Sequence, residues 1–150
     1  MNAEFINPFI QGSQRVLDSI CGGRPGLGKV FIKKPPFAPQ HVAVAISIIG
    51  AVKGTAIYTM DTSAGLFLVS RMMGGMSIET LDFMSQSALC ELANMISGNV
   101  ATAFSEKGIL IDITPPEFCG NSYPSLVGQA VCIPLLLQDG NVFEVDVCIA

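Results

Sequence analysis

Charged residues are scarce in this chain. They make up 13% of the 150 residues, only eight residues are lysine or arginine, and the net charge is −4. An average soluble domain is about a quarter charged. Because no basic surface could neutralise many phosphates, nucleic acid is not expected as a partner. Half of the residues are hydrophobic, which predicts one well-packed domain over residues 1–150 rather than a disordered chain.

Long apolar runs are also absent from the sequence. The two longest stretches without a charge lie between Lys34 and Lys53 and between Glu117 and Asp139, and prolines and amides interrupt both. Neither offers the roughly twenty continuous apolar residues of a membrane-spanning helix. The first residues include Glu4 and lack the basic segment followed by an apolar one that is typical of a secretory signal. We therefore expect a cytoplasmic protein without a membrane segment.

Residues that could bind a metal or a cofactor are few. His41 is the single histidine, and the five cysteines form no Cys-x-x-Cys pair, which is typical of reduced thiols in a core rather than of a zinc or disulfide framework. The segment Gly23–Lys29 has the spacing of a phosphate-binding loop, but Val30 stands where magnesium needs a hydroxyl group. We expect no metal and no cofactor in this chain.

Hydrophobic periodicity predicts three helices and six strands. The helices are expected over residues 4–20, 62–73 and about 77–107, the last with a break near 81–85. The strands are expected over residues 29–33, 41–50, 53–61, 109–114, 129–137 and 142–149. Asp139-Gly140 predicts a hairpin between the last two strands.

The order helix, strand, strand, strand occurs twice, over about 4–60 and 84–149, with the short helix of about 62–73 between the two pseudo-repeats. Aligning the proline pair at 35 with the pair at 115 gives an offset of 115 − 35 = 80. The fold class is therefore expected to be α/β, of the α+β type, with two long helices packed on one face of a mainly antiparallel sheet.

The second long helix has a polar stripe with almost no charge, formed by Ser87, Glu91, Asn94 and Gly98. A solvated helix face usually carries several lysines and glutamates. Glycine inside a helix costs roughly 0.5–1 kcal/mol relative to alanine, so Gly98 calls for close approach of another molecule or close packing within the same protein. The stripe is thus a docking site or an ordinary exposed helix face.

Three segments carry a family resemblance: the opening EFINPF, the block ELANMISGNVATAFSEKG, and the following strand that ends Thr-Pro-Pro. They resemble the CheC/CheX/FliY family of chemotaxis phosphatases, and the CheX type most. The family pattern is Asp or Ser, three residues, Glu, two residues, Asn and a later proline. Ser87, Glu91 and Asn94 match it in spacing, whereas Pro115 and Pro116 fall one or two residues early.

The resemblance implies a CheC-like fold, a homodimer, and hydrolysis of the aspartyl phosphate on a CheY-like response regulator. The regulator would bring its own Mg²⁺, so this chain would need no cofactor. Asn94 would orient the attacking water, Glu91 would form a salt bridge with a lysine of the regulator, and Ser87 and Gly98 would contact the partner. Two alternatives stay open: a module that binds the regulator without hydrolysis, and a flagellar-switch-type interaction domain.

The first helix is expected to be an inactive copy of the second. Under the offset of 80, Gln11 and Gln14 stand where the second helix has its carboxylate and its carboxamide, and Asp18 stands in place of the glycine. Gln11 has no charge to pair with a lysine, and Asp18 would repel a phosphoryl group.

Overall fold

The computed structural model describes residues 3–34, 42–124 and 128–149. His41 and the first proline pair lie outside these ranges. Within them the chain forms three helices, as predicted: α1 (Ala3–Cys21), α2 (Thr62–Met72) and α3 (Phe83–Glu106). None of these helices combines the length and the apolar character that a membrane span requires.

The third helix starts later than the predicted 77, at the position of the expected break. Asp82 is its N-cap residue, and its side chain accepts a hydrogen bond of 2.9 Å from the backbone nitrogen of Ser85. An Asp side chain in this position satisfies a backbone donor that has no partner within the helix. The cap therefore fixes the first turn of α3 and separates it from the segment that follows α2.

The described residues form one antiparallel sheet of eight strands, in the order β1-β7-β8-β4-β3-β5, with β2 paired to β7 and β6 paired to β3. The strands are β1 (Gly26–Leu27), β2 (Phe31–Lys33), β3 (Val42–Gly50), β4 (Gly54–Met60), β5 (Ile111–Ile113), β6 (Glu117–Phe118), β7 (Ala130–Leu136) and β8 (Val142–Ile149). The six predicted strands are confirmed, and the sequence prediction missed the two-residue strands β1 and β6.

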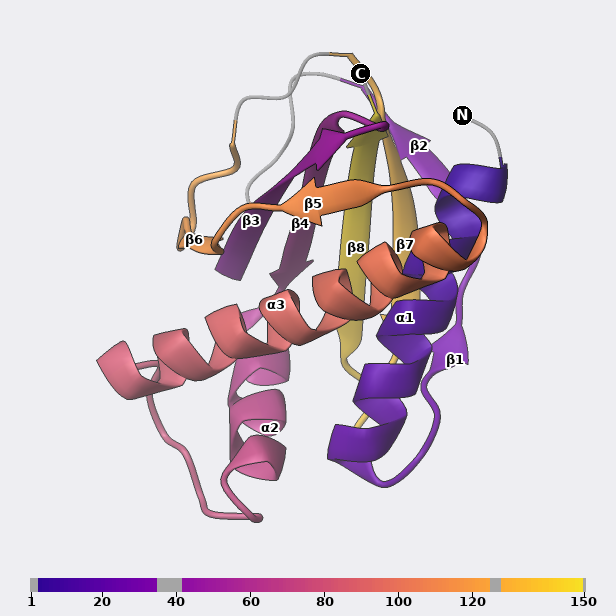
Figure 1. Ribbon diagram of the computed structural model, residues 1–150. Helices are drawn as coiled ribbons and strands as arrows, with labels where there is room; N and C mark the ends of the chain where they lie inside the picture. The colour runs from indigo at the N-terminus through magenta and orange to yellow at the C-terminus, as the bar shows by residue number, and fades with distance from the viewer. Residues whose placement is uncertain (1–2, 35–41, 125–127, 150) are drawn as a thin grey trace.

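Helices α1 and α3 cross in front of the sheet, and α2 lies beside the end of α3 where that helix begins (Figure 1). The side chains of Phe9 and Phe104 join the two long helices, with ring centroids 6.3 Å apart. The hydroxyl groups of Tyr58 on β4 and Ser97 on α3 form a buried hydrogen bond of 2.7 Å. These contacts hold α3 at a fixed place on the sheet.

The two halves of the chain exchange their short strands. β1 and β2, which follow α1, pair with β7 of the second half, whereas β5 and β6, which follow α3, pair with β3 of the first half. β4 and β8 join the halves at the centre of the sheet. Neither half therefore completes its own sheet.

The predicted offset of 80 between the halves is wrong. β3 and β7 begin at residues 42 and 130, and β4 and β8 begin at 54 and 142, so both shifts are 88. The glycines that follow the long helices with positive φ, Gly22 and Gly108, differ by 86. The strand starts and the helix ends therefore give a shift of 86 to 88 in place of 80.

The sheet face away from the helices contains a buried cluster of charged residues. Glu144 and Asp146 project to this face of β8, alternating with core valines. Lys33 reaches across from β2, with its Nζ 2.6 Å from Glu144 and 3.4 Å from Asp146. The hydroxyl group of Tyr123 donates a hydrogen bond to Asp146. Burial and the neighbouring Asp146 raise the pKa of the Glu144 carboxyl to about 7, although Lys33 opposes this shift.

We expect the protein to lose stability as the pH rises through about 7, and Glu144→Gln to remove much of this loss. The pKa of Glu144 in the folded protein lies above the ordinary value of 4.5. The protonated carboxyl therefore stabilises the folded state fully below pH 4.5, and this stabilisation is lost as the pH rises through the folded pKa. Glutamine can accept from Lys33 and donate to Asp146 without ionising. Urea unfolding midpoints of both proteins, measured from about pH 5 to about pH 8, test this. Unfolding midpoints that change with pH in the same way in both proteins would contradict this expectation.

Candidate functional site

The polar stripe of α3 lies on its outer face, as the sequence predicts. Ser87 and Glu91 are exposed and Asn94 is half-buried, while Leu92 and Ile96 on the opposite face are buried in the core. Glu91 and Asn94 are three residues apart, so their side chains project from neighbouring turns of the same helix face. The pair is therefore open to a partner and is no part of the core.

Ser87, Glu91 and Asn94 line one hollow of about 300 Å³. Its other wall is formed by Pro116 and Phe118, which follow β5. Thr114 holds this segment to β3 by two hydrogen bonds of 3.0 Å. Its backbone nitrogen donates to the carbonyl oxygen of Ser47, and the backbone nitrogen of Ser47 donates to the hydroxyl oxygen of Thr114. The early proline pair therefore does not displace the segment, because Pro116 still faces the site.

Three further residues of the hollow were missed by the sequence analysis: Phe83, Gln86 and Cys90. Phe83 lies four residues before Ser87, so the helical spacing alone could have placed it on the stripe. Burial raises the pKa of the Cys90 thiol, which keeps it in the protonated, unreactive form. The apolar part of the hollow is thus larger than the polar stripe suggests.

Glu91 and Asn94 have unused hydrogen-bonding capacity. Among the residues that the structure describes, neither side chain has a hydrogen-bond or ion-pair partner. The helix beneath them is held by the buried Tyr58–Ser97 hydrogen bond. The site therefore presents a carboxylate and a carboxamide on a rigid support, and the carboxamide can both accept and donate a hydrogen bond.

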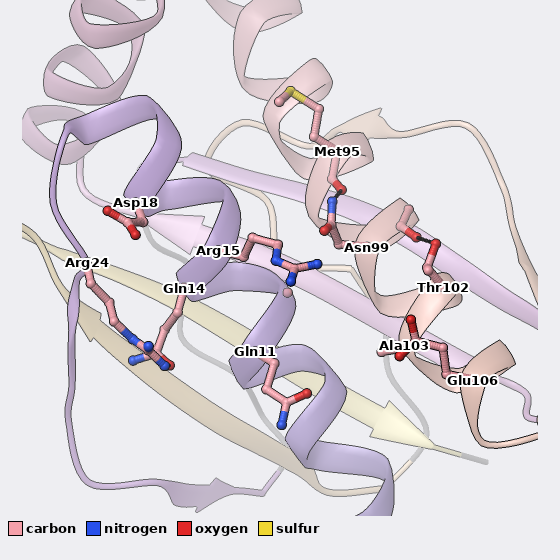
Figure 2. A pocket seen from close by; sticks show the side chains of 12 residues that line it. Gln11, Gln14, Arg15, Asp18, Arg24, Met95, Asn99, Thr102, Ala103 and Glu106 are labelled. Carbon is pink, nitrogen blue, oxygen red and sulfur yellow. Dashed lines mark hydrogen bonds between the residues drawn. The ribbon is translucent and has the colours of Figure 1, made fainter.

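Gly98 lies outside this hollow. It lines a second hollow of about 530 Å³ between α1 and α3, together with Asn99 and Thr102. Figure 2 shows Arg15 reaching from α1 toward α3 in this second hollow. A Cβ atom added at Gly98 would meet nothing within 4 Å, so close packing within the chain does not explain this glycine.

Close packing of the two helices depends on a different glycine. At Gly12 of α1 an added Cβ would lie 3.2 Å from Cγ2 of Val100 and 3.4 Å from the carbonyl oxygen of Ile96. Gly12 therefore lets the two helices approach each other. Close packing within the chain therefore does not account for Gly98, and close approach of another molecule stays a prediction.

The structure adds a reason to expect an inactive first helix, different from the lost carboxylate and the added Asp18. Gln14 is buried and accepts a hydrogen bond of 2.8 Å from Arg24 (Figure 2). It also donates one of 3.3 Å to the carbonyl oxygen of Pro25. It is a structural residue. Under the shift of 86 between the helix ends, Phe5 and Pro8 stand where α3 has Glu91 and Asn94. Neither residue can orient water or pair with a lysine.

A metal ligand set occurs elsewhere in the described ranges, in the cluster on the far face of the sheet. The ligand atoms of Cys132, Glu144 and Asp146 lie within 4.8 Å of one another. Lys33 already supplies a cation there, at 2.6 Å from Glu144. The hollow on α3 has one carboxylate, that of Glu91, which is too few ligands for a resident Mg²⁺ site built from protein side chains.

Comparison with known proteins identifies relatives of this arrangement. The family model described as chemotaxis phosphatase CheX matches residues 42–135. The protein named CheY-P phosphatase CheX from Thermotoga maritima is 34% identical over 116 residues, which are 77% of this chain and 75% of that protein. The predicted residues Glu91 and Asn94 lie within the matched range.

Solved structures share the fold. A CheC-like superfamily protein from Shewanella superposes with a TM-score of 0.87 at 24% identity, covering 100% of this chain and 99% of its own. CheX in the CheX-CheY-BeF3-Mg²⁺ complex from Borrelia burgdorferi has a TM-score of 0.83 at 28% identity, covering 97% of each chain. The predicted CheC-like α+β fold is confirmed.

Replacing each of the two glycines by alanine should separate their roles. Gly98→Ala should raise the free energy of unfolding by about 0.5–1 kcal/mol, because alanine favours the helix and its Cβ has room. Gly12→Ala should bring a smaller gain or none, since its Cβ would lie tightly against Val100 and Ile96 of α3, which would have to shift by a few tenths of an ångström. Urea unfolding of the two variants and the parent chain measures both effects. A destabilised Gly98→Ala protein would show that the glycine is needed for folding.

Proposed function

The chain belongs to the CheX family of chemotaxis phosphatases, and on that premise we propose that it hydrolyses the aspartyl phosphate of a CheY-like response regulator. The observation that supports this most is the pair Glu91 and Asn94 on the outer face of α3, whose side chains have no hydrogen-bond or ion-pair partner among the described residues. The relative from Thermotoga maritima is named a CheY-P phosphatase. The relative from Borrelia burgdorferi forms a complex with CheY, BeF3 and Mg²⁺.

Asn94 is proposed to position the attacking water. Its carboxamide oxygen accepts a hydrogen bond from the water, and its nitrogen can donate to a phosphoryl oxygen. The water oxygen forms the new bond to phosphorus while the bond between phosphorus and the aspartyl oxygen breaks. The aspartate leaves as a carboxylate, and the protons of the water pass to the phosphate. Phosphoryl transfer needs little beyond this orientation, since the transition state is largely dissociative.

Glu91 is proposed to hold the regulator rather than to remove a proton. A carboxylate beside the phosphoryl oxygens would be repelled by them, and a loose transition state gains little from a general base. A salt bridge to a lysine of the regulator gives the exposed carboxylate a role that also aligns the two proteins. Mg²⁺ would come with the regulator, because the hollow has only one carboxylate of its own.

Ser87 and Gly98 are proposed to let the partner approach the helix closely. Both have small side chains, and they lie about one helical turn on either side of the pair. The room above Gly98 supports this role, since among the described residues nothing beyond its own stretch of helix lies within 4 Å of an added Cβ.

A homodimer stays a prediction. Leu27 and Ile32 on the short edge strands β1 and β2 are exposed to 46% and 58%, and apolar side chains on a sheet edge support contact with a second copy.

Asn94→Ala should slow hydrolysis about a hundredfold or more while the regulator still binds. Removal of one preorganised transition-state contact costs roughly 3 kcal/mol, which corresponds to this change in rate. Phosphate release from the phosphorylated regulators of the same organism measures it, and Asn99→Ala is the matched control because Asn99 lies outside the hollow. An Asn94→Ala protein with the parent rate would refute the role of the carboxamide.

Glu91→Ala should weaken binding of the regulator as well as turnover, because it removes one partner of the proposed salt bridge. Titration of the BeF3-loaded regulator by calorimetry measures the dissociation constant, which should rise about tenfold. Glu106→Ala, an exposed carboxylate at the other end of α3, is the matched control. Normal binding by Glu91→Ala would leave the docking role without support.

A further inference from the structure

The first turn of α3 exposes two large apolar side chains. Phe83 is 83% exposed and Met84 is 68% exposed, whereas Leu81 just before them packs against the core. The cap at Asp82 fixes the backbone of this turn. Phe83 and Met84 therefore contribute little to folding, and contact with another molecule is what would remove their apolar surface from water.

Phe83 is continuous with the candidate site. It lines the same hollow as Glu91 and Asn94 and faces the apolar wall formed by Pro116 and Phe118. Phe83 and Asn94 are eleven residues apart, which is about 16 Å along a helix. A standard protein interface covers about 800 Å² of each partner, and a disc of that area has a radius of about 16 Å. A protein that is centred on Asn94 would therefore reach Phe83.

The residue types also fit an interface. Phenylalanine and methionine are enriched at the cores of protein interfaces, and charged residues are depleted there. The neighbouring carboxylate of Asp82 is engaged in the cap of the helix, and the next charged residue along the stripe is Glu91, two turns away from Phe83. The two apolar side chains would thus supply binding energy, and Glu91 and Asn94 would supply charge pairing and chemistry.

We propose that Phe83 and Met84 form an apolar anchor that the response regulator covers when its aspartyl phosphate meets Asn94. The proposal rests on the proposed function, because it takes the regulator as the occupant. The surface of the regulator that this anchor would contact is apolar and lies beside the phosphorylated aspartate. Phe83 and Met84 are positioning residues: they contact the partner protein and do not touch the phosphoryl group.

The test separates binding from chemistry by measuring kcat and KM with the phosphorylated regulator. Phe83→Ala should raise KM about tenfold, which is typical when an interface anchor is truncated, and change kcat less than about twofold. The double variant with Met84→Ala should raise KM further, and Phe83→Leu should keep KM within about threefold of the parent. Because Phe83 is exposed, these variants should fold like the parent chain.

Leu110→Ala is the matched control. Leu110 is 70% exposed and follows the opposite end of α3, outside the hollow of Glu91 and Asn94. Its removal should leave both kcat and KM unchanged. An equal rise in KM for this variant would mean that any lost apolar surface weakens binding, and it would overturn the assignment to Phe83 and Met84.

Other outcomes also decide the matter. An unchanged KM for Phe83→Ala refutes the anchor. If Phe83→Ala instead turns a dimer into a monomer in analytical ultracentrifugation, with KM unchanged, a second copy of the chain covers this turn and the proposal is wrong. If the parent chain releases no phosphate from any regulator, the proposed function fails by itself. In that case, calorimetric titration of the BeF3-loaded regulators with the parent and the Phe83→Ala protein tests the anchor. The anchor is refuted if the parent chain binds no regulator, or if Phe83→Ala binds as tightly as the parent.

Discussion

Burial of one face of α3 against the sheet determines which of its residues can meet another molecule. Leu92 and Ile96 are buried beneath the helix, and the Tyr58–Ser97 hydrogen bond ties it to β4. Since successive residues of a helix turn by about 100°, fixing the inner face also directs Glu91 and Asn94 outward. Under the proposed function the Asn94 amide needs such a support to hold a water molecule in line, because a small misplacement of a catalytic group has a large effect on rate.

The chemical contribution of this chain is small, and the rest of the protein serves to place it. One carboxylate, Glu91, and two carboxamides, Asn94 and Gln86, line the hollow, and the Gln86 amide already donates to the carbonyl oxygen of Leu81. The charged cluster on the far face of the sheet forms its ion pairs internally, with Lys33. Under the proposed function, the metal ion and the lysine that stabilise the phosphoryl group belong to the regulator. This division of labour explains why a sequence with so few charged residues can still belong to a phosphatase family.

Periodic features of the sequence were predictable, and features without a period were not. The three helices bury apolar stripes, so their spacing predicted them to within a few residues, apart from the start of α3 at its Asp82 cap. Strands β1 and β6 have two residues each, too few for alternation to show. The second wall of the hollow depends on where the segment after β5 runs, and the position of Phe118 beside Asn94 comes from that tertiary pairing.

The most direct test of the account is the decay of the phosphorylated regulator under single-turnover conditions, followed at increasing concentrations of this chain with Mg²⁺ present. The decay rate should rise with the concentration of the chain and saturate far above the spontaneous rate. Saturable binding in which the bound regulator keeps its spontaneous decay rate would contradict it, because Glu91 and Asn94 would then hold the partner without positioning water for hydrolysis.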